Sequence, residues 1–209
     1  AAVATATDSI RIGPMVTPLS RRRMSTLIRQ TVTLDHLSNG RLTLGIGLGV
    51  DTDGELTRFG EVTDPRTRAD ILDESADLLV EAWAGEVVTH RGEHRLIDGV
   101  AFRPTPLQRP RIPIWCAARG DALRPVLRAA RFEGLFLIEV DADQLGRALD
   151  QVVAVRGSLE GFDVAVVAAK DDMTLLEVPG VTWAMHMHPA DATFDSVWAA
   201  AVAGPPPKT

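Results

Sequence analysis

The most informative part of this 209-residue sequence is LDHLSNGRLTLGIGLGV, residues 34–50. Apolar residues three or four apart predict a helix over 24–37, Ser38-Asn39-Gly40 is a turn signal, and a β-rich run over 41–47 follows. In a parallel α/β fold the functional loops follow the carboxyl ends of strands, whereas residues at the amino ends serve stability. We therefore expect the polar residues ahead of this strand to be structural and the glycines behind it to approach a ligand.

Two groups of residues carry that expectation. The polar residues of the expected structural turn are Asp35, His36, Ser38, Asn39 and Arg41. The glycines at and after the strand end are Gly45, Gly47 and Gly49. Glycine lets a backbone come close to a flat or phosphorylated molecule. No helix follows these glycines as a dinucleotide-binding fingerprint requires, so a purely structural role for them stays open.

Apolar strand-like runs alternate with helical patterns along the rest of the chain. The strands are expected to begin near residues 10, 41, 112, 134, 162 and 181, and the helices to cover 67–83, 123–131, 143–156 and 194–203. This alternation is typical of a parallel sheet covered by helices. Six strands fit either an open doubly wound sheet or a (β/α)₈ barrel lacking two of its eight strands, since such barrels typically have ~250 residues.

The remaining segments complete the expected architecture. Short alternating pieces over 86–109 predict a small hairpin-like insertion. Residues 1–9, AAVATATDS, resemble the tail of an Ala-rich helix entered partway, which indicates a missing first part. We expect residues 1–209 to form a single domain, because no linker or repeat divides them.

Composition excludes several classes of protein. With 45% hydrophobic and 24% charged residues, the chain is neither a disordered polymer nor a collagen-like fibre. The formal charge of −6 provides no basic field for nucleic acid. No run approaches the ~18 apolar residues of a membrane helix. The single cysteine, Cys116, cannot form an internal disulfide, so we expect a cytoplasmic protein.

A second candidate loop is CAARGDALR, residues 116–124, which joins an expected strand to an expected helix. Backbone amides at such a helix start, with Arg119 nearby, are suited to holding a phosphate group. The alternative is that Asp121 is an ordinary helix cap and Arg119 is solvent-exposed. Cys116 itself, on a buried strand, is expected to serve packing.

The histidines do not indicate a metal site. His90 and His94 fall in the hairpin-like insertion, where a surface position is expected, and neither they nor His186 and His188 have partners at zinc-site spacing. His186 and His188 follow a strand end, so they are candidate pocket residues, although a ligand role is the weaker interpretation.

Five segments together resemble one protein family, the bacterial-luciferase-like monooxygenases, which include flavin-dependent and deazaflavin F420-dependent oxidoreductases. The segments are SIRIGPMVTPLSRRR, LIRQTVTLDHLSNGRLTLGIGLG, RPRIPIWCAARG, RAARFEG and VTWAMHMHP. The resemblance runs from about Ala1 to Pro206, and LDxLSxGRxxLGxGxG is its most specific pattern.

The resemblance implies a TIM-type barrel, usually dimeric, with the cofactor ring of FMN or F420 over the carboxyl ends of the strands. It implies a non-prolyl cis peptide at Met15-Val16 and a phosphate contact from the loop over 117–120. The cofactor-binding residues that it implies are Met15, Val16, Thr17, Gly47, Gly49, Ala117, Ala118, Arg119 and Gly120.

The sequence departs from the family pattern in ways that bear on activity. Family members carry about two more strands and a helix before the segment that matches residue 1, and these have no counterpart here. In several subfamilies that part includes a histidine used in proton transfer. Val50 stands where some F420-dependent relatives have glutamate, and the phosphate loop often has glycine where Ala117 or Ala118 stands. Asp51, Asp53 and Glu55 lie near the candidate site, but the pattern identifies no catalytic acid or base.

Three hypotheses follow. The first is a luciferase-like monooxygenase, an oxidoreductase that uses reduced FMN or F420 on an unknown small organic substrate and forms a homodimer. The second is a non-catalytic flavin-binding or structural relative that has lost its first barrel strands. The third is that these residues are the retained part of a longer enzyme.

Overall fold

The computed structural model describes residues 1–167, 174–189 and 191–204. Its main sheet has six parallel strands in the order β1-β2-β5-β6-β7-β8. The strands are β1 (Thr17–Pro18), β2 (Leu44–Gly47), β5 (Ile114–Arg119), β6 (Gly134–Ile138), β7 (Asp163–Val167) and β8 (Trp183–Met185). The helices are α1 (Ala2–Ala6), α2 (Met24–Leu37), α3 (Pro65–Ala84), α4 (Leu123–Ala129), α5 (Ala142–Arg156) and α6 (Phe194–Ala203). Short 3₁₀ turns cover Leu19–Arg21, Thr57–Phe59 and Thr174–Glu177.

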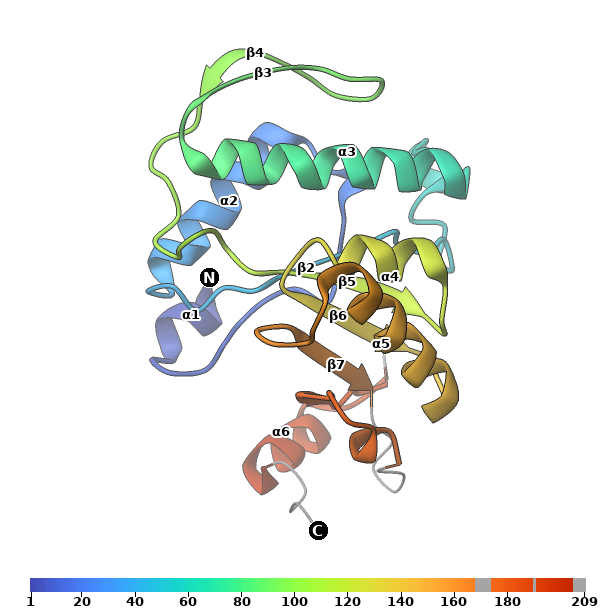
Figure 1. Cartoon of the computed structure of the whole chain (residues 1–209). Helices are drawn as coiled ribbons and strands as arrows, with labels where there is room; N and C mark the ends of the chain where they lie inside the picture. The colour runs from blue at the N-terminus through green and yellow to red at the C-terminus, as the bar shows by residue number, and fades with distance from the viewer. Residues whose placement is uncertain (168–173, 190, 205–209) are drawn as a thin grey trace.

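The strand order distinguishes a barrel from a doubly wound sheet. Neighbouring strands in the main sheet follow one another along the chain, apart from the separate hairpin strands β3 and β4. The crossovers therefore share one hand and place the helices on one side of the sheet. Figure 1 shows α3, α4 and α5 around the outside of the strands. The described sheet has edges at β1 and β8. It is therefore a curved six-stranded part of a (β/α)₈ barrel, as predicted.

Side chains alternate between the two faces of this sheet. On β5, Ile114, Cys116 and Ala118 belong to the larger core that packs against the helices. Trp115 and Ala117 point to the opposite face. There they join a separate apolar cluster, here called the interior cluster, which contains Met15, Val16, Trp115, Ala117, Phe136, Ile138, Ala165, Val167, Trp183 and Met185. This cluster fills the concave side of the sheet.

The helix termini follow local sequence rules. Asp64 caps α3 by accepting the Thr67 amide at 2.7 Å, and Pro65 occupies the first helical position. Gly85 ends the helix at a φ of 79°. The predicted helix over 67–83 is confirmed, and it begins slightly earlier because of this cap. The predicted helix over 194–203 is confirmed as α6.

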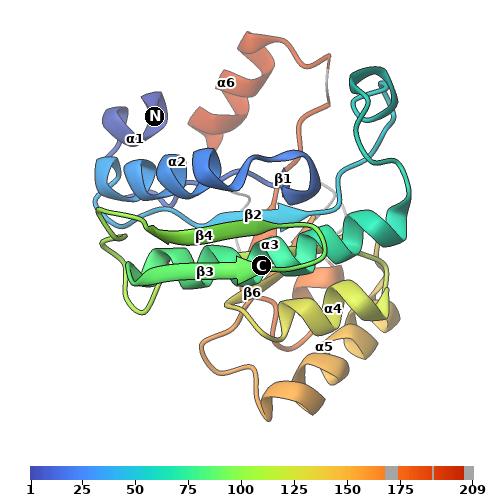
Figure 2. The ribbon, with the colours of Figure 1, turned by 90° about the horizontal axis from the view of Figure 1, so that it is seen from above.

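A two-stranded antiparallel hairpin, β3 (Val87–Arg91) and β4 (Leu96–Ala101), confirms the prediction for 86–109. Figure 2 shows both strands running alongside α3. Glu74 of α3 holds the hairpin: it pairs with His90 at 2.7 Å and accepts the amides of His94 and Arg95. His90 is therefore half-buried rather than a plain surface residue.

The first expected strand is wrong in its extent. Over residues 10–16 the structure has a single bridge, from Ile12 to Leu42, and β1 begins only at Thr17. Pro14 has no amide hydrogen to donate to a ladder, which breaks the strand at this point. The expected strand from Phe162 is confirmed as β7, while Ala168 lies outside the described residues. In the described part of the chain, no helix is long and apolar enough to cross a membrane.

Candidate functional site

The carboxyl ends of the parallel strands meet at one rim of the sheet. In register, Pro18 pairs with Gly47 and Arg119 pairs with Ile138. The candidate cofactor residues fall at this rim, on β1, β2 and β5 and on the segments that flank them. The structure thus brings together residues that lie far apart in the sequence.

The Met15-Val16 peptide bond is cis, as the family resemblance predicted. Both side chains belong to the interior cluster, and their segment lies directly on the glycines of β2. A Cβ at Gly45 would lie 2.3 Å from the Pro14 carbonyl oxygen, and one at Gly47 would lie 2.6 Å from Val16 Cγ2. Packing within the protein therefore already requires glycine at both positions. A direct ligand contact of Gly47 stays a prediction.

The loop after β2 is held by its own polar groups. Asp51 accepts the Leu56 amide at 2.6 Å, which is the main reason that its pKa lies below the ordinary value. Glu55 pairs with Arg21 at 2.6 Å. The buried Arg68 donates to the carbonyls of Leu48 and Gly49. Asp51 and Glu55 thus have structural partners, whereas Asp53 is exposed without a role in this loop's hydrogen bonds.

Two hollows open at the rim. One, of about 380 Å³, lies at the end of β1 and is lined in part by Val16, Thr17, Arg21 and Phe59. Another, of about 390 Å³, lies at the ends of β6 and β7. The second hollow, here called the β6–β7 hollow, is apolar apart from one ion pair and is lined by Arg119, Ile138, Glu139, Val140, Val167, Leu175 and Met187.

The loop over 117–120 differs in detail from the expectation. Ala117 faces the interior cluster, but the Ala118 side chain is buried on the helix side, so only its backbone is available at the rim. Gly120 has a φ of 52°, and its amide donates to the Ile138 carbonyl at 3.2 Å. Arg119 donates to both carboxylate oxygens of Glu139, at 2.5 and 2.6 Å. The guanidinium is the strongest anion-binding group that this loop offers.

The alternative interpretation of the loop is confirmed for Arg119, which is exposed, and wrong for Asp121. Asp121 does not cap α4, whose N-cap is Ala122; instead it accepts from Arg147 at 2.8 Å. This hydrogen bond lowers the pKa of Asp121. The predicted cap is wrong because Asp121 binds Arg147 on α5, a contact that sequence spacing does not reveal.

The candidate histidines at the end of β8 lie away from the hollows. His186 and His188 are exposed and line neither hollow at the rim, whereas Met187 between them lines the β6–β7 hollow. Cys116 is buried on the helix side of β5, and burial raises the pKa of its thiol to about 12, which supports packing rather than nucleophilic chemistry. Within the described ranges, no cluster of three or more His, Cys, Asp or Glu is arranged to hold a metal ion.

The turn ahead of β2 is structural, as predicted. Asp35 is fully buried and accepts the amides of Leu107 and Gln108 at 2.6 and 3.1 Å. Arg41 donates to the carbonyls of Ala4, Thr7 and Ile10 and so ties α1 to this end of the sheet.

Sequence reasoning missed a group at the amino end of the interior. Arg11 pairs with Asp163 at 3.2 Å and lies over the rings of Trp115 and Trp183, 5.8 and 5.6 Å from their centroids. Trp183 also donates to Asp163 at 3.0 Å. The one sequence signal for this group was a charged residue, Arg11, between Ile10 and Ile12 in an otherwise apolar strand-like run. This group lies at the amino end of the interior cluster, and Arg11 also lines a separate hollow of about 560 Å³ between the segment over 10–14 and helices α1 and α2.

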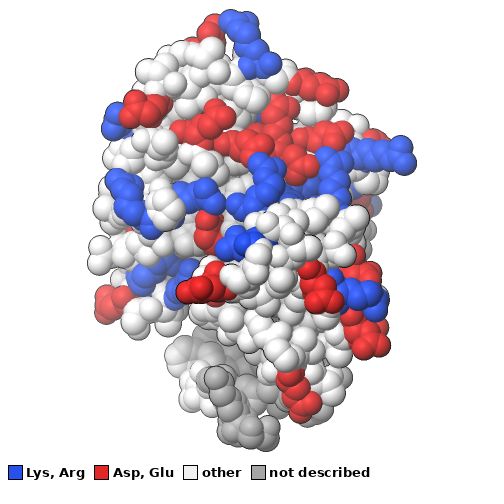
Figure 3. Space-filling model, viewed as in Figure 1, with Lys and Arg blue, Asp and Glu red and all other residues white. Residues whose placement is uncertain are grey.

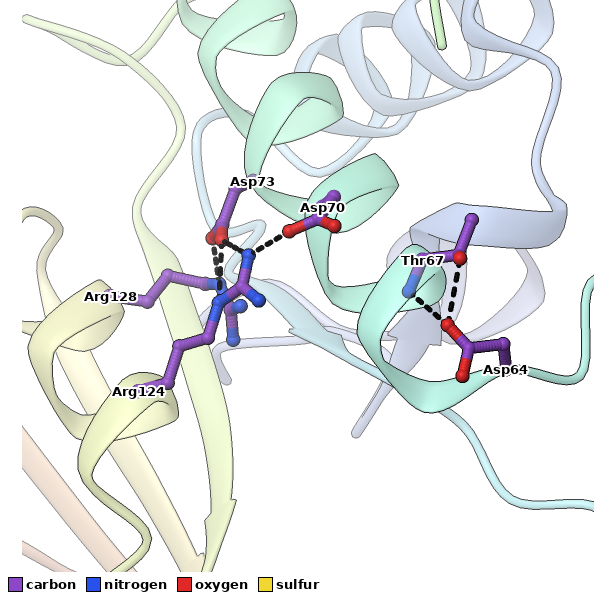
Figure 4. A network of polar contacts seen from close by, with 6 residues as sticks. All are labelled: Asp64, Thr67, Asp70, Asp73, Arg124 and Arg128. Carbon is purple, nitrogen blue, oxygen red and sulfur yellow. Dashed lines mark hydrogen bonds and ion pairs between the residues drawn. The ribbon is translucent and has the colours of Figure 1, made fainter. Parts of the chain in front are cut away.

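The helix after the 117–120 loop is fixed to α3 by ion pairs. Figure 3 shows acidic side chains gathered beside basic ones on this face. In Figure 4, Asp73 receives hydrogen bonds from both Arg124 and Arg128, and Asp70 receives one from Arg124. Arg131 and Asp77 extend the row. These contacts position α4, and with it the end of β5.

A family model for luciferase-like monooxygenases matches residues 1–169. The chain belongs to the luciferase-like monooxygenase family. Among curated relatives, it is 30% identical over 213 aligned positions to a phthiodiolone/phenolphthiodiolone dimycocerosates ketoreductase of Mycobacterium kansasii, covering 90% of this chain and 57% of that protein. It is 38% identical over 115 positions to the uncharacterized protein y4wF of Sinorhizobium fredii, covering 55% and 33%.

Solved luciferase-like structures show the same fold. A coenzyme F420-dependent tetrahydromethanopterin reductase of Methanopyrus kandleri matches with a TM-score of 0.69 at 20% identity, over 80% of this chain and 52% of that one. The monooxygenase RslO1 of Streptomyces bottropensis matches with a TM-score of 0.68 at 25% identity, over 81% and 54%. An FMN complex of the oxygenating constituent of 3,6-diketocamphane monooxygenase from Pseudomonas putida matches at 0.65 and 18%, over 80% and 50%. This chain thus spans about half the length of these family members.

Proposed function

We propose that the protein is an oxidoreductase that uses reduced FMN or F420 on a small organic substrate. The observation that carries the proposal is the shape of the interior. It is apolar, with Arg11 and two tryptophans at its amino end, and at the carboxyl-end rim Val16 and Ala117 lie against Gly47 while Arg119 ends the neighbouring strand β5.

The residues at the rim fit a flat ring with an anionic tail. The β6–β7 hollow, of about 390 Å³, falls within the usual size of small-molecule sites and has apolar walls with one ion pair, between Arg119 and Glu139. Met15, Val16, Thr17, Gly47, Gly49 and Ala117 would border the ring, while Arg119 and the backbone of Ala118 and Gly120 would lie toward a phosphate. When bound, the cofactor supplies the redox chemistry. The apolar side chains exclude water, and the guanidinium orients the anionic end.

The names of the structural relatives support this cofactor class without separating its members. The Methanopyrus reductase is described as F420-dependent, and the Pseudomonas monooxygenase is in complex with FMN. The ketoreductase name of the mycobacterial relatives supports an oxidoreductase but does not identify this protein's substrate. Homodimerisation and a cytoplasmic location, the latter consistent with one buried free cysteine, belong to the same proposal.

A non-catalytic flavin-binding relative is the second candidate. It is favoured by one observation: Asp51 and Glu55, two acids of the rim loop, both have structural partners. Cofactor binding without substrate-dependent turnover would distinguish this candidate from the enzyme.

Titration with FMN and with F420, followed by cofactor fluorescence, tests the proposal. We expect saturable binding of at least one of them. Ala117→Phe, which places a large side chain beside Gly47 in the interior cluster, should abolish binding, whereas Val87→Phe on the exposed hairpin strand should not. Failure of both cofactors to bind the folded protein would refute the proposal.

A further inference from the structure

Glu139 has an unusual backbone conformation at the rim. It directly follows β6, and its φ is 53°, one of only two positive values among the non-glycine residues that the structure describes. Left-handed backbone is unfavourable for a residue with a Cβ atom. Such residues cluster at functional sites, where the surrounding structure holds them in place.

The side chain of Glu139 reaches across to the neighbouring strand. Arg119 ends β5 and donates through one nitrogen to both carboxylate oxygens of Glu139, at 2.5 and 2.6 Å. Both residues line the β6–β7 hollow. The Gly120 amide donates to the Ile138 carbonyl and holds the two strand ends together beneath the pair. The ion pair is therefore part of the wall of the hollow.

Two other arginines close to this loop are engaged elsewhere. Arg147 pairs with Asp121 at 2.8 Å, and Arg124 pairs with Asp70 and Asp73 at 2.5 and 2.7 Å. Arg119 differs from them because its partner lies at the hollow itself. An anion entering the hollow would thus compete with Glu139 for the guanidinium.

We propose that Glu139 is a built-in competitor for the phosphate group of the ligand. Its carboxylate occupies Arg119 in the free protein and is displaced when a phosphorylated ligand enters the β6–β7 hollow. The inference rests on the proposed function for the identity of that ligand. It assigns Arg119 as an anion-binding residue and Glu139 as a residue that sets the affinity for the anion.

Physical chemistry supports an exchange of this kind. Carboxylate and phosphate offer a guanidinium the same arrangement of acceptor oxygens, so one can replace the other. The side chains of Arg119 and Glu139 are 55% and 65% exposed, so water and salt screen the pair and make it weak enough to exchange. After exchange, the released carboxylate still lies near the bound phosphate, and the two like charges repel.

The test compares FMN with riboflavin, which has the same ring and no phosphate, on matched variants. Glu139→Gln should tighten FMN binding by about three- to tenfold, because both the competition and the repulsion are removed. Riboflavin affinity should change less than about twofold. Glu139→Gln made in an Arg119→Gln background should lose most of this gain. Asp98→Asn, which breaks the exposed Arg91–Asp98 pair on the hairpin, should leave both affinities unchanged.

Inorganic phosphate provides an arm that does not depend on a flavin. Phosphate should shift the Arg119 side-chain NMR signal at a lower concentration in the Glu139→Gln variant than in the wild-type protein. The inference would be overturned if Glu139→Gln changed the affinities for FMN and riboflavin equally. It would also be overturned if Glu139→Gln changed neither the affinity for FMN nor the affinity for phosphate. If neither flavin nor F420 binds while phosphate still responds to Glu139→Gln, the proposed function fails and the competition stands.

Discussion

Replacing Asp73 by alanine tests whether the α3–α4 ion pairs hold α4 in place. Asp73 is the central acceptor of the network in Figure 4: Arg124 donates to it at 2.7 and 3.2 Å, and Arg128 donates to it as well. The Arg128 side chain is only 5% exposed, so losing this partner leaves a buried guanidinium with no opposing charge.

The magnitude follows from the burial of the two partners. Breaking a buried ion pair by removing one partner costs about 3–5 kcal/mol, whereas an exposed pair contributes about 0–1 kcal/mol. Since the Asp73 side chain is 28% exposed, the pair lies between these limits. We expect Asp73→Ala to lower the free energy of unfolding by about 2–3 kcal/mol. Asp77→Ala, on the same helix with its partner Arg131 half exposed, should cost at most about 1 kcal/mol.

Urea denaturation at fixed protein concentration measures both effects. The midpoint should fall in both variants while the m-value stays constant, and the fall should be larger for Asp73→Ala. The two variants make the same change of residue type within α3, so helix propensity cancels from the comparison.

Acid provides a second signature of the same contact. Desolvation by itself would raise the pKa of Asp73, but the hydrogen bonds from Arg128 and Arg124 outweigh it and hold the pKa below its ordinary value. A lowered folded-state pKa contributes stability above the unfolded-state pKa of about 3.9, and this contribution is lost as the pH falls through the folded-state pKa. The stability difference between wild type and Asp73→Ala should therefore be full at neutral pH and shrink below about pH 4. Equal costs for the two variants, or a difference that does not change in acid, would refute this reasoning.

Three further predictions concern packing. Gly45→Ala places a Cβ 2.3 Å from the Pro14 carbonyl oxygen and should lower the urea midpoint by an amount equivalent to about 1–3 kcal/mol. The control Gly146→Ala, in open space within α5, should raise the midpoint by an amount equivalent to about 0.5–1 kcal/mol. The reverse order would contradict the packing described for β2. Native Cys116 should resist thiol-specific reagents at pH 8 and react only after unfolding, as followed by mass spectrometry, since burial raises its pKa to about 12; rapid native labelling would count against its position. Asp35→Ala leaves the part-buried amides of Leu107 and Gln108 without this acceptor and should lower the free energy of unfolding by about 1–3 kcal/mol in the same urea assay, with no loss of secondary structure. A cost under about 0.5 kcal/mol would contradict its structural role.

Much of the fold could be predicted because its signals are local. The segment over 34–50 contains a helix end, a turn and a strand in consecutive residues, and their assignment from spacing agrees with α2 and β2. The roles of Asp35 and Arg41 followed from their place ahead of the strand. The strand predicted to begin near residue 10 is wrong in its extent because the interruption at Pro14 outweighs the apolar pattern around it.

The site was harder to predict because its contacts are nonlocal. Arg119 was a candidate from its loop, but its pairing with Glu139 depends on two strand ends that only the sheet brings together. The glycines of β2 illustrate the same limit, since a sequence does not reveal that Pro14 and Val16 pass directly over them. Arg11 was overlooked because its partners, Asp163 and two tryptophans, come much later in the chain.

The most direct test of the cofactor proposal is to locate the bound molecule by backbone amide NMR during titration with FMN or F420. The account predicts saturable shifts at the carboxyl-end rim, above all at Gly47, Gly49, Arg119 and Gly120, and little change at the structural turn around Asn39. Saturable shifts concentrated at that turn or on the β3–β4 hairpin, with the rim unchanged, would contradict it.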